Sequence, residues 1–275
     1  MSHVTCDNCL MPPLEIKEMI LDLLAEDYEG HSALKTCSLV CQEFLPICRK
    51  HIFGSIVLTN DREFPSHSAH VFGCLLRKTP EIADYIRKLD YTISIRDLTS
   101  PLIQESLKRI SRLEFLAVLL DDFHGPRLDW SNNPIRPTLL HLLHLPTLTH
   151  FKVNYFSYFV VSDLIPCVNL KYLHIGNDMS AAAENTFPEI LPVHPIRLNK
   201  FVIRYASADV TTKLCTARRP GGQPIIDFGS LSEITVGIGY PDEVEASQEL
   251  VRRCRFLTNV QINCKRYLHY DHQDF

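Results

Sequence analysis

The sequence predicts an α/β protein in which a small helical module is followed by a repeating array of strands and helices. Apolar residues between Met11 and Phe53 fall at helical spacing, a six-residue apolar pattern recurs from Phe53 onward, and segments with helical spacing separate its copies. Strands that alternate with helices in this way form a parallel sheet with right-handed crossovers. We therefore expect a helical module over residues 10–53, a solenoid over residues 54–268, and flexible ends at residues 1–9 and 269–275.

The predicted helical module contains two amphipathic runs. Their apolar positions are Ile16, Ile20, Leu23 and Leu24 in the first run, and Leu34, Cys37, Cys41, Phe44, Leu45 and Cys48 in the second. Pro12 and Pro13 suit the start of the first helix, because a proline at the first helical position loses no hydrogen bond. Pro46 interrupts the second run, so residues 39–53 are predicted as two short helices or one kinked helix. A unit of about forty residues has too small a core to stand alone, so it should pack on a neighbour or a partner.

The repeated pattern has apolar residues at its first, fourth and sixth positions. Its eight copies are Phe53–Leu58, Ile86–Tyr91, Leu113–Val118, Leu148–Val153, Leu170–Ile175, Leu198–Ile203, Leu231–Val236 and Leu257–Ile262. Their mean spacing lies in the range of leucine-rich repeats, in which each unit contributes one short strand. The residues after the last copy are few and polar, so the C-terminal cap is expected to be weak or the last copy frayed.

Side chains alternate along a strand, so the variable residues of each copy should face the concave surface when the apolar ones point into the core. Two rows are predicted to cross this surface. The first is Lys88, Phe115, His150, Tyr172, Lys200, Glu233 and Asn259, and the second is Asp90, Ala117, Lys152, His174, Val202, Thr235 and Gln261.

Basic and aromatic side chains gather in the middle of these rows. The members of this patch are His150, Lys152, Tyr172, His174, Lys200 and Arg204. We expect the patch to bind an acidic or phosphorylated segment of a protein target, because cationic clusters hold such segments. The alternative is that these are ordinary solvated side chains on an exposed sheet.

Two inserts, Asp121–Pro137 and Arg218–Pro224, are rich in glycine and proline. Both are predicted to be surface loops that could overhang the binding face. The first contains Trp130, the only tryptophan. This side chain either anchors a partner or pins its own loop to the array.

The composition limits the classes of function. Hydrophobic residues at 45% and charged residues at 22% of the 275 residues are typical of a folded protein, and the formal charge of -4 gives no support for nucleic-acid binding. Neither a signal peptide nor a membrane span is indicated, so we expect a cytoplasmic or nuclear protein without a membrane partner. The ten cysteines should then be reduced thiols.

No motif for catalysis is present, so neither enzyme activity nor a cofactor is expected. Cys6 and Cys9 have metal-ligand spacing, but no second cysteine pair follows, and zinc there is a minor alternative. His141 and His144 fall on a helical run, whereas His150 falls in the next strand on the opposite side of the unit. These histidines are expected to pack or to lie at the surface, and no metal site is predicted.

The N-terminal residues resemble a known motif. Met11-Pro12-Pro13-Leu14-Glu15-Ile16, Ser38-Leu39-Val40-Cys41-Gln42-Glu43-Phe44, Arg49-Lys50-His51-Ile52-Phe53 and Ile56-Val57-Leu58 look like an F-box, in the form common in fungal F-box-like proteins. The resemblance covers residues 10–58. Leu14-Glu15 is transposed relative to the usual Pro-x-Glu-Leu order, and Phe44 stands where tryptophan is commoner. The irregular copies that follow resemble the repeats of F-box leucine-rich-repeat proteins.

This resemblance implies a three-helix module that docks on the Skp-type adaptor of an SCF-type (cullin-RING) ubiquitin ligase, while the repeats bind a protein target. The expected adaptor-binding residues are Pro12, Pro13, Leu14, Ile16, Ile20, Leu39, Val40 and Phe44. Leu23, Leu34, Cys37 and Cys41 are expected to hold the module together. The chain would then be a non-catalytic substrate receptor. One alternative is a protein-binding scaffold without ubiquitin-ligase association, and another is an enzyme with an unrecognised site, for which the sequence provides no motif. The helical module could also be a generic cap on a repeat domain.

Overall fold

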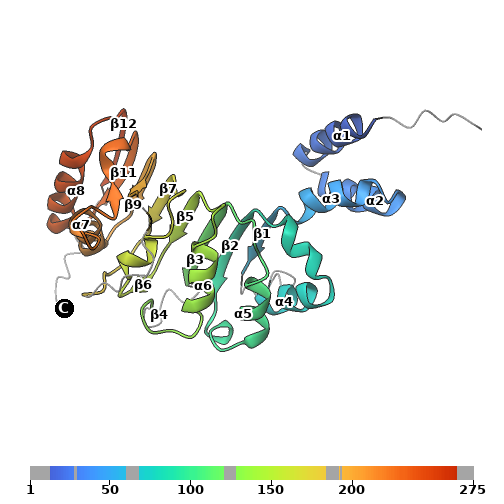
Figure 1. Cartoon of the computed structure of the whole chain (residues 1–275), viewed down its shortest axis with the longest axis horizontal. Coiled ribbons are helices and arrows are strands. Elements are labelled where there is room, and N and C mark those ends of the chain that lie inside the picture. Colours follow the sequence, from blue (N-terminus) through green and yellow to red (C-terminus); the bar gives the residue numbers. More distant parts are fainter. Residues whose placement is uncertain are drawn as a thin grey trace, which may run out of the picture. The chain divides into compact units, whose positions relative to one another are not determined.

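The computed structural model describes residues 13–27, 30–59, 68–120, 128–183, 192 and 194–264 (Figure 1). The chain divides into two compact units, residues 1–55 and 56–275. Pro12, the Cys6 and Cys9 pair and the segment 269–275 lie outside the described residues. None of the described helices is long and apolar enough to cross a membrane.

The first unit contains three helices that pack on one another, namely α1 (Leu14–Glu26), α2 (Gly30–Val40) and α3 (Phe44–Phe53). Its core consists of four buried side chains, from Leu21, Leu34, Ile47 and Cys48. Leucine and isoleucine side chains that are fully buried contribute about 1.5–3 kcal/mol each, so this core supplies little more than the minimum for a folded unit.

The break between α2 and α3 lies at residues 41–43. The interruption is predicted at Pro46, and this placement is wrong. Pro46 is the third residue of α3. Proline is tolerated there because the N–H groups of the first helical turn have no partner within the helix.

Eight strands form the main sheet of the second unit and follow one another in chain order (Figure 1). They are β1 (Ser55–Leu58), β2 (Lys88–Ile93), β3 (Phe115–Leu120), β5 (His150–Val153), β7 (Tyr172–Ile175), β9 (Lys200–Ile203), β11 (Glu233–Ile238) and β12 (Asn259–Cys264). The described pairings from β2 to β12 are all parallel. Each strand overlaps one of the eight predicted copies, which confirms an α/β fold with a mostly parallel sheet.

Helices connect the strands and form a second layer beside the sheet (Figure 1). They are α4 (Ala69–Lys78), α5 (Pro101–Leu107), α6 (Arg136–Leu143), α7 (Ala208–Thr216) and α8 (Pro241–Arg253), with the 3-10 helices η2 (Pro80–Tyr85), η3 (Ile95–Asp97), η4 (Val161–Leu164) and η5 (Phe228–Ser230). Consecutive helices pack on one another, α4 on α5, α5 on α6 and α7 on α8. Two short parallel ladders accompany them, β4 (Leu128–Asp129) with β6 (Phe156–Ser157) and β8 (Ile196–Arg197) with β10 (Ile226–Asp227).

The core of the second unit lies between the sheet and this helical layer. Leu116, Phe151, Leu173 and Phe201 pair side by side in the register and are fully buried. The last strand differs, because its Val260 and Ile262 are 51% and 58% exposed. β12 is nevertheless paired with β11 along its whole length, so the last copy is formed but its apolar side chains are not covered within the described residues.

Hydroxyl side chains join neighbouring copies of the repeat. Thr149 Oγ1 donates to the carbonyl oxygen of Glu114 at 3.1 Å, and Ser232 Oγ donates to that of Asn199 at 2.9 Å. Thr258 Oγ1 donates in turn to the carbonyl oxygen of Ser232 at 3.0 Å. All three hydroxyls follow the first apolar residue of their copy. Each such bond contributes about 0.5–1.5 kcal/mol and holds the parallel register.

The predicted loop Asp121–Pro137 is packed into the unit where it is described. Its residues include β4 and the start of α6. Trp130 is fully buried, with its ring centroid 5.3 Å from that of Phe156 and 5.0 Å from that of Phe159. The expectation of an exposed tryptophan anchor is therefore wrong, and the alternative, that Trp130 pins its own loop, is confirmed.

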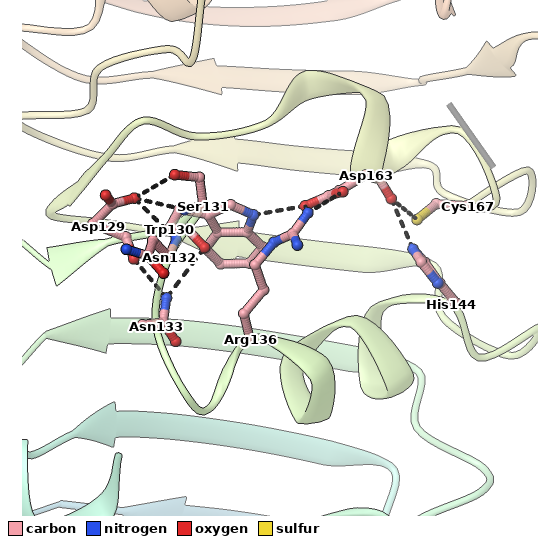
Figure 2. A network of polar contacts seen from close by, with 9 residues as sticks. All are labelled: Asp129, Trp130, Ser131, Asn132, Asn133, Arg136, His144, Asp163 and Cys167. Carbon is pink, nitrogen blue, oxygen red and sulfur yellow. Dashed lines mark hydrogen bonds and ion pairs between the residues drawn. The ribbon is translucent and has the colours of Figure 1, made fainter. Parts of the chain in front are cut away.

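A buried carboxylate holds this tryptophan in place (Figure 2). Trp130 Nε1 donates to Asp163 Oδ2 at 2.8 Å, and Arg136 Nη2 donates to Oδ1 and Oδ2 at 2.8 and 2.9 Å. The carbonyl oxygen of Asp163 lies 2.8 Å from His144 Nε2. Asp163 thereby links η4 to α6 and to the segment after β4. We call this set of contacts the Asp163 network.

The second predicted loop, Arg218–Pro224, is a tight turn. Gly221 and Gly222 have φ angles of 97° and 83°, in the left-handed region that favours glycine. Arg219 is nevertheless buried, and its Nη1 and Nη2 donate to the carbonyl oxygens of Pro192 and His194 at 2.7 and 2.6 Å. The turn is thus fixed to the unit at its base.

Replacement of Asp163 tests the contribution of its network to stability. Asp163→Ala leaves the Arg136 guanidinium and the Trp130 N–H without their partner, so we expect the free energy of unfolding to fall by about 3–5 kcal/mol. Urea unfolding followed by circular dichroism and by the fluorescence of the single tryptophan measures this change. Glu249→Ala is the control, because Glu249 pairs with Arg253 at the surface and such pairs contribute about 1 kcal/mol or less. Equal effects of the two substitutions would contradict the assignment.

Candidate functional site

The strand register places both predicted rows on one face of the sheet, which we call the open face. Lys88, Phe115, His150, Tyr172, Lys200, Glu233 and Asn259 are successive partners in the first row, and Asp90, Ala117, Lys152, His174, Val202, Thr235 and Gln261 are successive partners in the second. The order of both rows is therefore confirmed, but Ala117 and Val202 of the second row are buried. The parallel strands bring together residues that are far apart in the sequence.

A hollow of about 810 Å³ opens on this face. Five of the six predicted target-binding residues line it, namely Lys152, Tyr172, His174, Lys200 and Arg204. We call it the cationic hollow. Thr235 and Gln261 line it from β11 and β12, so it spans the strands from β5 to β12.

The sixth predicted residue, His150, lies beside the hollow and does not line it. Its ring centroid is 5.5 Å from that of Tyr172 and 6.2 Å from that of Phe115. Burial and the neighbouring Lys88 lower the pKa of His150, while Glu114 opposes this shift. His150 therefore extends the aromatic border of the hollow and adds no charge to it at neutral pH.

The three cations of the hollow differ in their partners. Lys200 Nζ lies 2.9 Å from Glu233 Oε2, and this hydrogen-bonded pair raises the pKa of Lys200. The side chains of Lys152 and Arg204 form neither a hydrogen bond nor an ion pair within the part of the chain that the structure describes. Lys152 also acts on Asp90. The pKa of Asp90 is raised, because the effect of burial outweighs the opposing charge of Lys152. Arg204 and Lys152 thus have no hydrogen-bonded partner among the described residues, and Asp90 partly offsets the charge of Lys152.

His174 lies at the bottom of the hollow and is only 7% exposed. Burial, followed by the charges of Lys152 and Arg204, lowers its pKa to about 4. Its Nδ1 is 3.5 Å from the hydroxyl oxygen of Tyr172. The pKa of Tyr172 is raised, because the effect of burial outweighs the opposing charges of Lys200 and Arg204. A neutral imidazole and a neutral phenol therefore offer polar atoms between the cations at pH 7.

The segment that carries Arg204 is fixed by a buried carboxylate that the sequence analysis does not identify. Glu243 is 4% exposed and accepts hydrogen bonds from the backbone N–H groups of Ala206, Gly239 and Tyr240. Ser207 Oγ also donates to the carbonyl oxygen of Gly176 at 2.7 Å. The acidic first turn of a helix that begins at Pro241 is the signal that could have indicated this role.

Exposed apolar side chains form a second candidate surface, on the first unit. Of the predicted adaptor-binding residues, Leu14, Ile16, Ile20, Leu39 and Val40 are exposed, and so are Met19 and Leu23. Helical spacing places Ile16, Met19, Ile20 and Leu23 on one side of α1, and Leu39 and Val40 end α2. We call the seven exposed residues together the apolar face. Pro13 is also exposed, and Pro12 lies outside the described residues.

One residue of the module lies on the opposite side from the predicted one, and another is partly buried. Phe44 packs against the core with part of its side chain exposed, and its place in the outer contact stays a prediction. Leu23 is 63% exposed, although it is expected inside. The inward face of α1 is set by Lys17, Leu21 and Leu24, and Leu23 lies two residues, or about 200°, from Leu21.

The inward Lys17 explains why the apolar pattern alone misplaces this face. Its Nζ forms an ion pair with the carboxylate of Glu43, so a lysine occupies a position that helical spacing assigns to an apolar residue. His51 Nε2 lies 2.7 Å from Asp22 Oδ1 and forms a second contact between α1 and α3. Leu34 is buried as expected, and Cys37 packs against the core.

Among the described residues, no group of three or more histidine, cysteine, aspartate or glutamate side chains could hold a metal ion. His144 is bonded to the carbonyl oxygen of Asp163, and His141 is exposed. The described cysteines are free thiols. Burial raises the pKa of Cys167 and Cys215, which keeps both thiols protonated.

The low pKa of His174 makes stability depend on pH in a defined direction. The folded chain protonates His174 near pH 4 and the unfolded chain near 6.5, so the unfolded state binds more protons between these values. Stability is greatest above pH 6.5 and falls as the pH is lowered toward 4, by about 3 kcal/mol from this residue. Chemical unfolding of wild type and His174→Gln at pH 7 and at pH 4.5 measures the difference. A pH dependence that is identical in both proteins would contradict this pKa.

No protein-family model matches this chain, and no curated protein shows significant similarity to it. The apolar face and the cationic hollow are therefore the features from which a function is inferred.

Proposed function

We propose that this chain is the non-catalytic substrate-recognition subunit of an SCF-type ubiquitin ligase. In this proposal the first unit is an F-box-like module that binds a Skp-type adaptor, and through it a cullin. The second unit is an irregular leucine-rich-repeat solenoid that binds a protein target on its open face. The chain would act in the cytoplasm or the nucleus, with neither nucleic acid nor membrane as a partner.

The apolar face is the observation that carries this proposal. A three-helix unit with four buried core residues exposes seven large apolar ones, so much of its apolar surface remains in water. Burying one such side chain contributes about 1.5–3 kcal/mol. The four that share one side of α1, Ile16, Met19, Ile20 and Leu23, can together contribute about 6–12 kcal/mol. This is comparable with the cost of association, which is about 4–15 kcal/mol. The resemblance of residues 10–58 to an F-box gives the reason to expect a Skp-type adaptor as the protein that covers them.

The open face supports the second half of the proposal. Its side chains vary from strand to strand while the buried positions stay apolar, which suits a surface that selects one partner. Holding a target beside an enzyme replaces a chance encounter with a fixed arrangement, and this proximity accelerates transfer. The chain would supply that arrangement while other subunits carry out the chemistry.

A protein-binding scaffold without ubiquitin-ligase association is the second candidate. Two features favour it, namely the transposed Leu14-Glu15 pair and the packing of Phe44 against the core, which reduces the surface it offers to an adaptor. Co-purification of the wild-type chain with a Skp-type adaptor separates the candidates. Absence of binding at micromolar concentrations would favour the scaffold.

Charged substitutions on the apolar face test the docking surface. Ile16→Glu combined with Ile20→Glu places two carboxylates one turn apart on α1, and we expect adaptor affinity to fall by at least about tenfold because each charge must be desolvated. Both residues are exposed, so the thermal midpoint should stay close to that of wild type. Binding is measured by co-purification and by calorimetric titration.

Val71→Glu is the matched control, because Val71 is an exposed apolar residue on α4 of the other unit. It should leave adaptor affinity unchanged. If the double variant binds the adaptor as well as wild type does, the assignment of the docking surface to α1 is wrong.

A further inference from the structure

We infer that the last strand of the sheet, β12, pairs with β12 of a second copy of this chain and joins two molecules about a twofold axis. The surface that makes this contact consists of Val244, Val251, Val260 and Ile262, which we call the terminal surface. All four residues belong to the second unit. The inference therefore goes beyond the proposed function and does not rest on it.

The terminal surface is exposed because no described helix follows β12 in the chain. In the register with β11, Val260 lies beside Ile234 and Ile262 beside Val236, so both side chains point toward the helical layer. Ile234 and Val236 are buried there, whereas Val260 and Ile262 are 51% and 58% exposed. The helices that cover the inner strands have no counterpart for β12 among the described residues.

The last helix, α8, is exposed on the matching side. Val244, Gln248 and Val251 are spaced by four and three residues, so they lie on one side of α8, and all three are exposed. Asp242 and Glu249 lie on another side and line a hollow that α7 also borders. Val244 and Val251 therefore face away from α7, in the direction in which β12 extends the sheet.

The outer edge of β12 offers backbone groups for pairing. β12 stands at the end of the strand order, so no described strand pairs with this edge. The backbone N–H of Asn259 donates to the carbonyl oxygen of Ser232, at the start of β11, at 3.0 Å. Backbone groups alternate in direction along a parallel strand, so those of Val260 and Ile262 point to the outer edge. Proteins usually protect such an edge with charged residues or proline, and the six residues of β12 include neither.

A second copy matches this edge through symmetry. With a twofold axis at Gln261, the two β12 strands run antiparallel, and Val260 of each copy lies opposite Ile262 of the other. These are the residues whose backbone groups point outward, so each such pair can exchange two hydrogen bonds. The axis is perpendicular to the sheet and keeps both helical layers on one side. Four aliphatic side chains then leave water together between the two α8 helices.

The terminal surface carries no charge, which favours a second copy over a charged partner. β12 has no charged side chain, and Val244, Gln248 and Val251 are uncharged as well. Near a twofold axis each charge meets its own sign, and like charges brought together oppose association. A charged partner would find no complementary charge on this surface, whereas a second copy meets no repulsion there.

The test measures the association of the purified full-length chain without an adaptor. We expect sedimentation equilibrium to show monomer and dimer in exchange between about 1 and 100 μM. Hydrogen exchange followed by NMR should slow at the N–H groups of Val260 and Ile262 as the concentration rises, because pairing covers them. The N–H of Asn259, which is already bonded to the neighbouring strand, should change little.

A monomer over this whole range would overturn the inference. If the N–H groups of Val260 and Ile262 were protected in that monomer at every concentration, the terminal surface would be covered by residues 265–275 of the same chain. If they exchanged rapidly, it would be uncovered. Neither result is compatible with a second copy as the occupant.

Charged substitutions locate the contact. Val260→Lys combined with Ile262→Lys should raise the dissociation constant of the dimer by at least about tenfold, because the added charges must be desolvated next to their own copies. Both residues are exposed, so the thermal midpoint of the monomer should stay close to that of wild type. The matched control is Val57→Lys, on the strand β1 at the other edge of the sheet, where Val57 is 48% exposed. Equal losses in the two proteins, or no loss in the double variant, would contradict the assignment.

Cysteine substitutions test the position of the axis. Gln261→Cys places two thiols directly opposite each other, at a Cα separation of about 4.5 Å, so oxidised glutathione should link the dimer by a disulfide. Asn259→Cys is the control on the same strand and face, because its two copies lie about 14 Å apart in this register. Wild type tests Cys264, whose copies lie about 20 Å apart and should stay unlinked. Linking through Asn259→Cys or through Cys264, with none through Gln261→Cys, would overturn the proposed pairing.

Discussion

The structure depends on one constraint, that backbone groups within a parallel sheet are satisfied only by the neighbouring strands. Each inner strand must therefore align with the strands before and after it, and a shift by one residue would turn its apolar side chains out of the core. The buried row of Leu116, Phe151, Leu173 and Phe201 fixes that alignment. Once it is fixed, the strand positions of the open-face side chains follow, whatever contacts those side chains make with one another. The candidate site is in this sense a product of core packing.

The same constraint explains how much of the fold could be predicted. The eight copies of the apolar pattern identify the eight strands because strand side chains have a period of two and the copies keep it. Contacts that depend on individual side chains could not be predicted in this way. The burial of Trp130 depends on an aspartate that is distant in the sequence, and the inward orientation of Lys17 depends on Glu43. No local pattern records such pairings.

The candidate site could also be predicted only in part. Its membership could be predicted from alternation alone, because Lys152, His174 and Arg204 fall at outward positions of known strands. Its electrostatics could not, since the depth of His174 and the pairing of Lys200 with Glu233 require the distances between strands. For the first unit, the spacing of apolar residues predicts the helices but not which side of α1 faces the core. Because Lys17 faces inward, Leu23 lies outside, on the same side of α1 as Ile16 and Ile20.

The Asp163 network has a consequence for how this chain can change over generations. Arrays of repeats commonly gain or lose whole copies, because each copy touches only its neighbours and the junctions are equivalent. Here Trp130 and Arg136 lie between β3 and β5, and Asp163 lies in η4, between β5 and β7. One set of contacts therefore ties two successive connections together. Removing or duplicating a copy in this stretch would separate a buried charge from its partner. We therefore expect changes in length to be better tolerated toward the ends of the sheet than in this middle stretch.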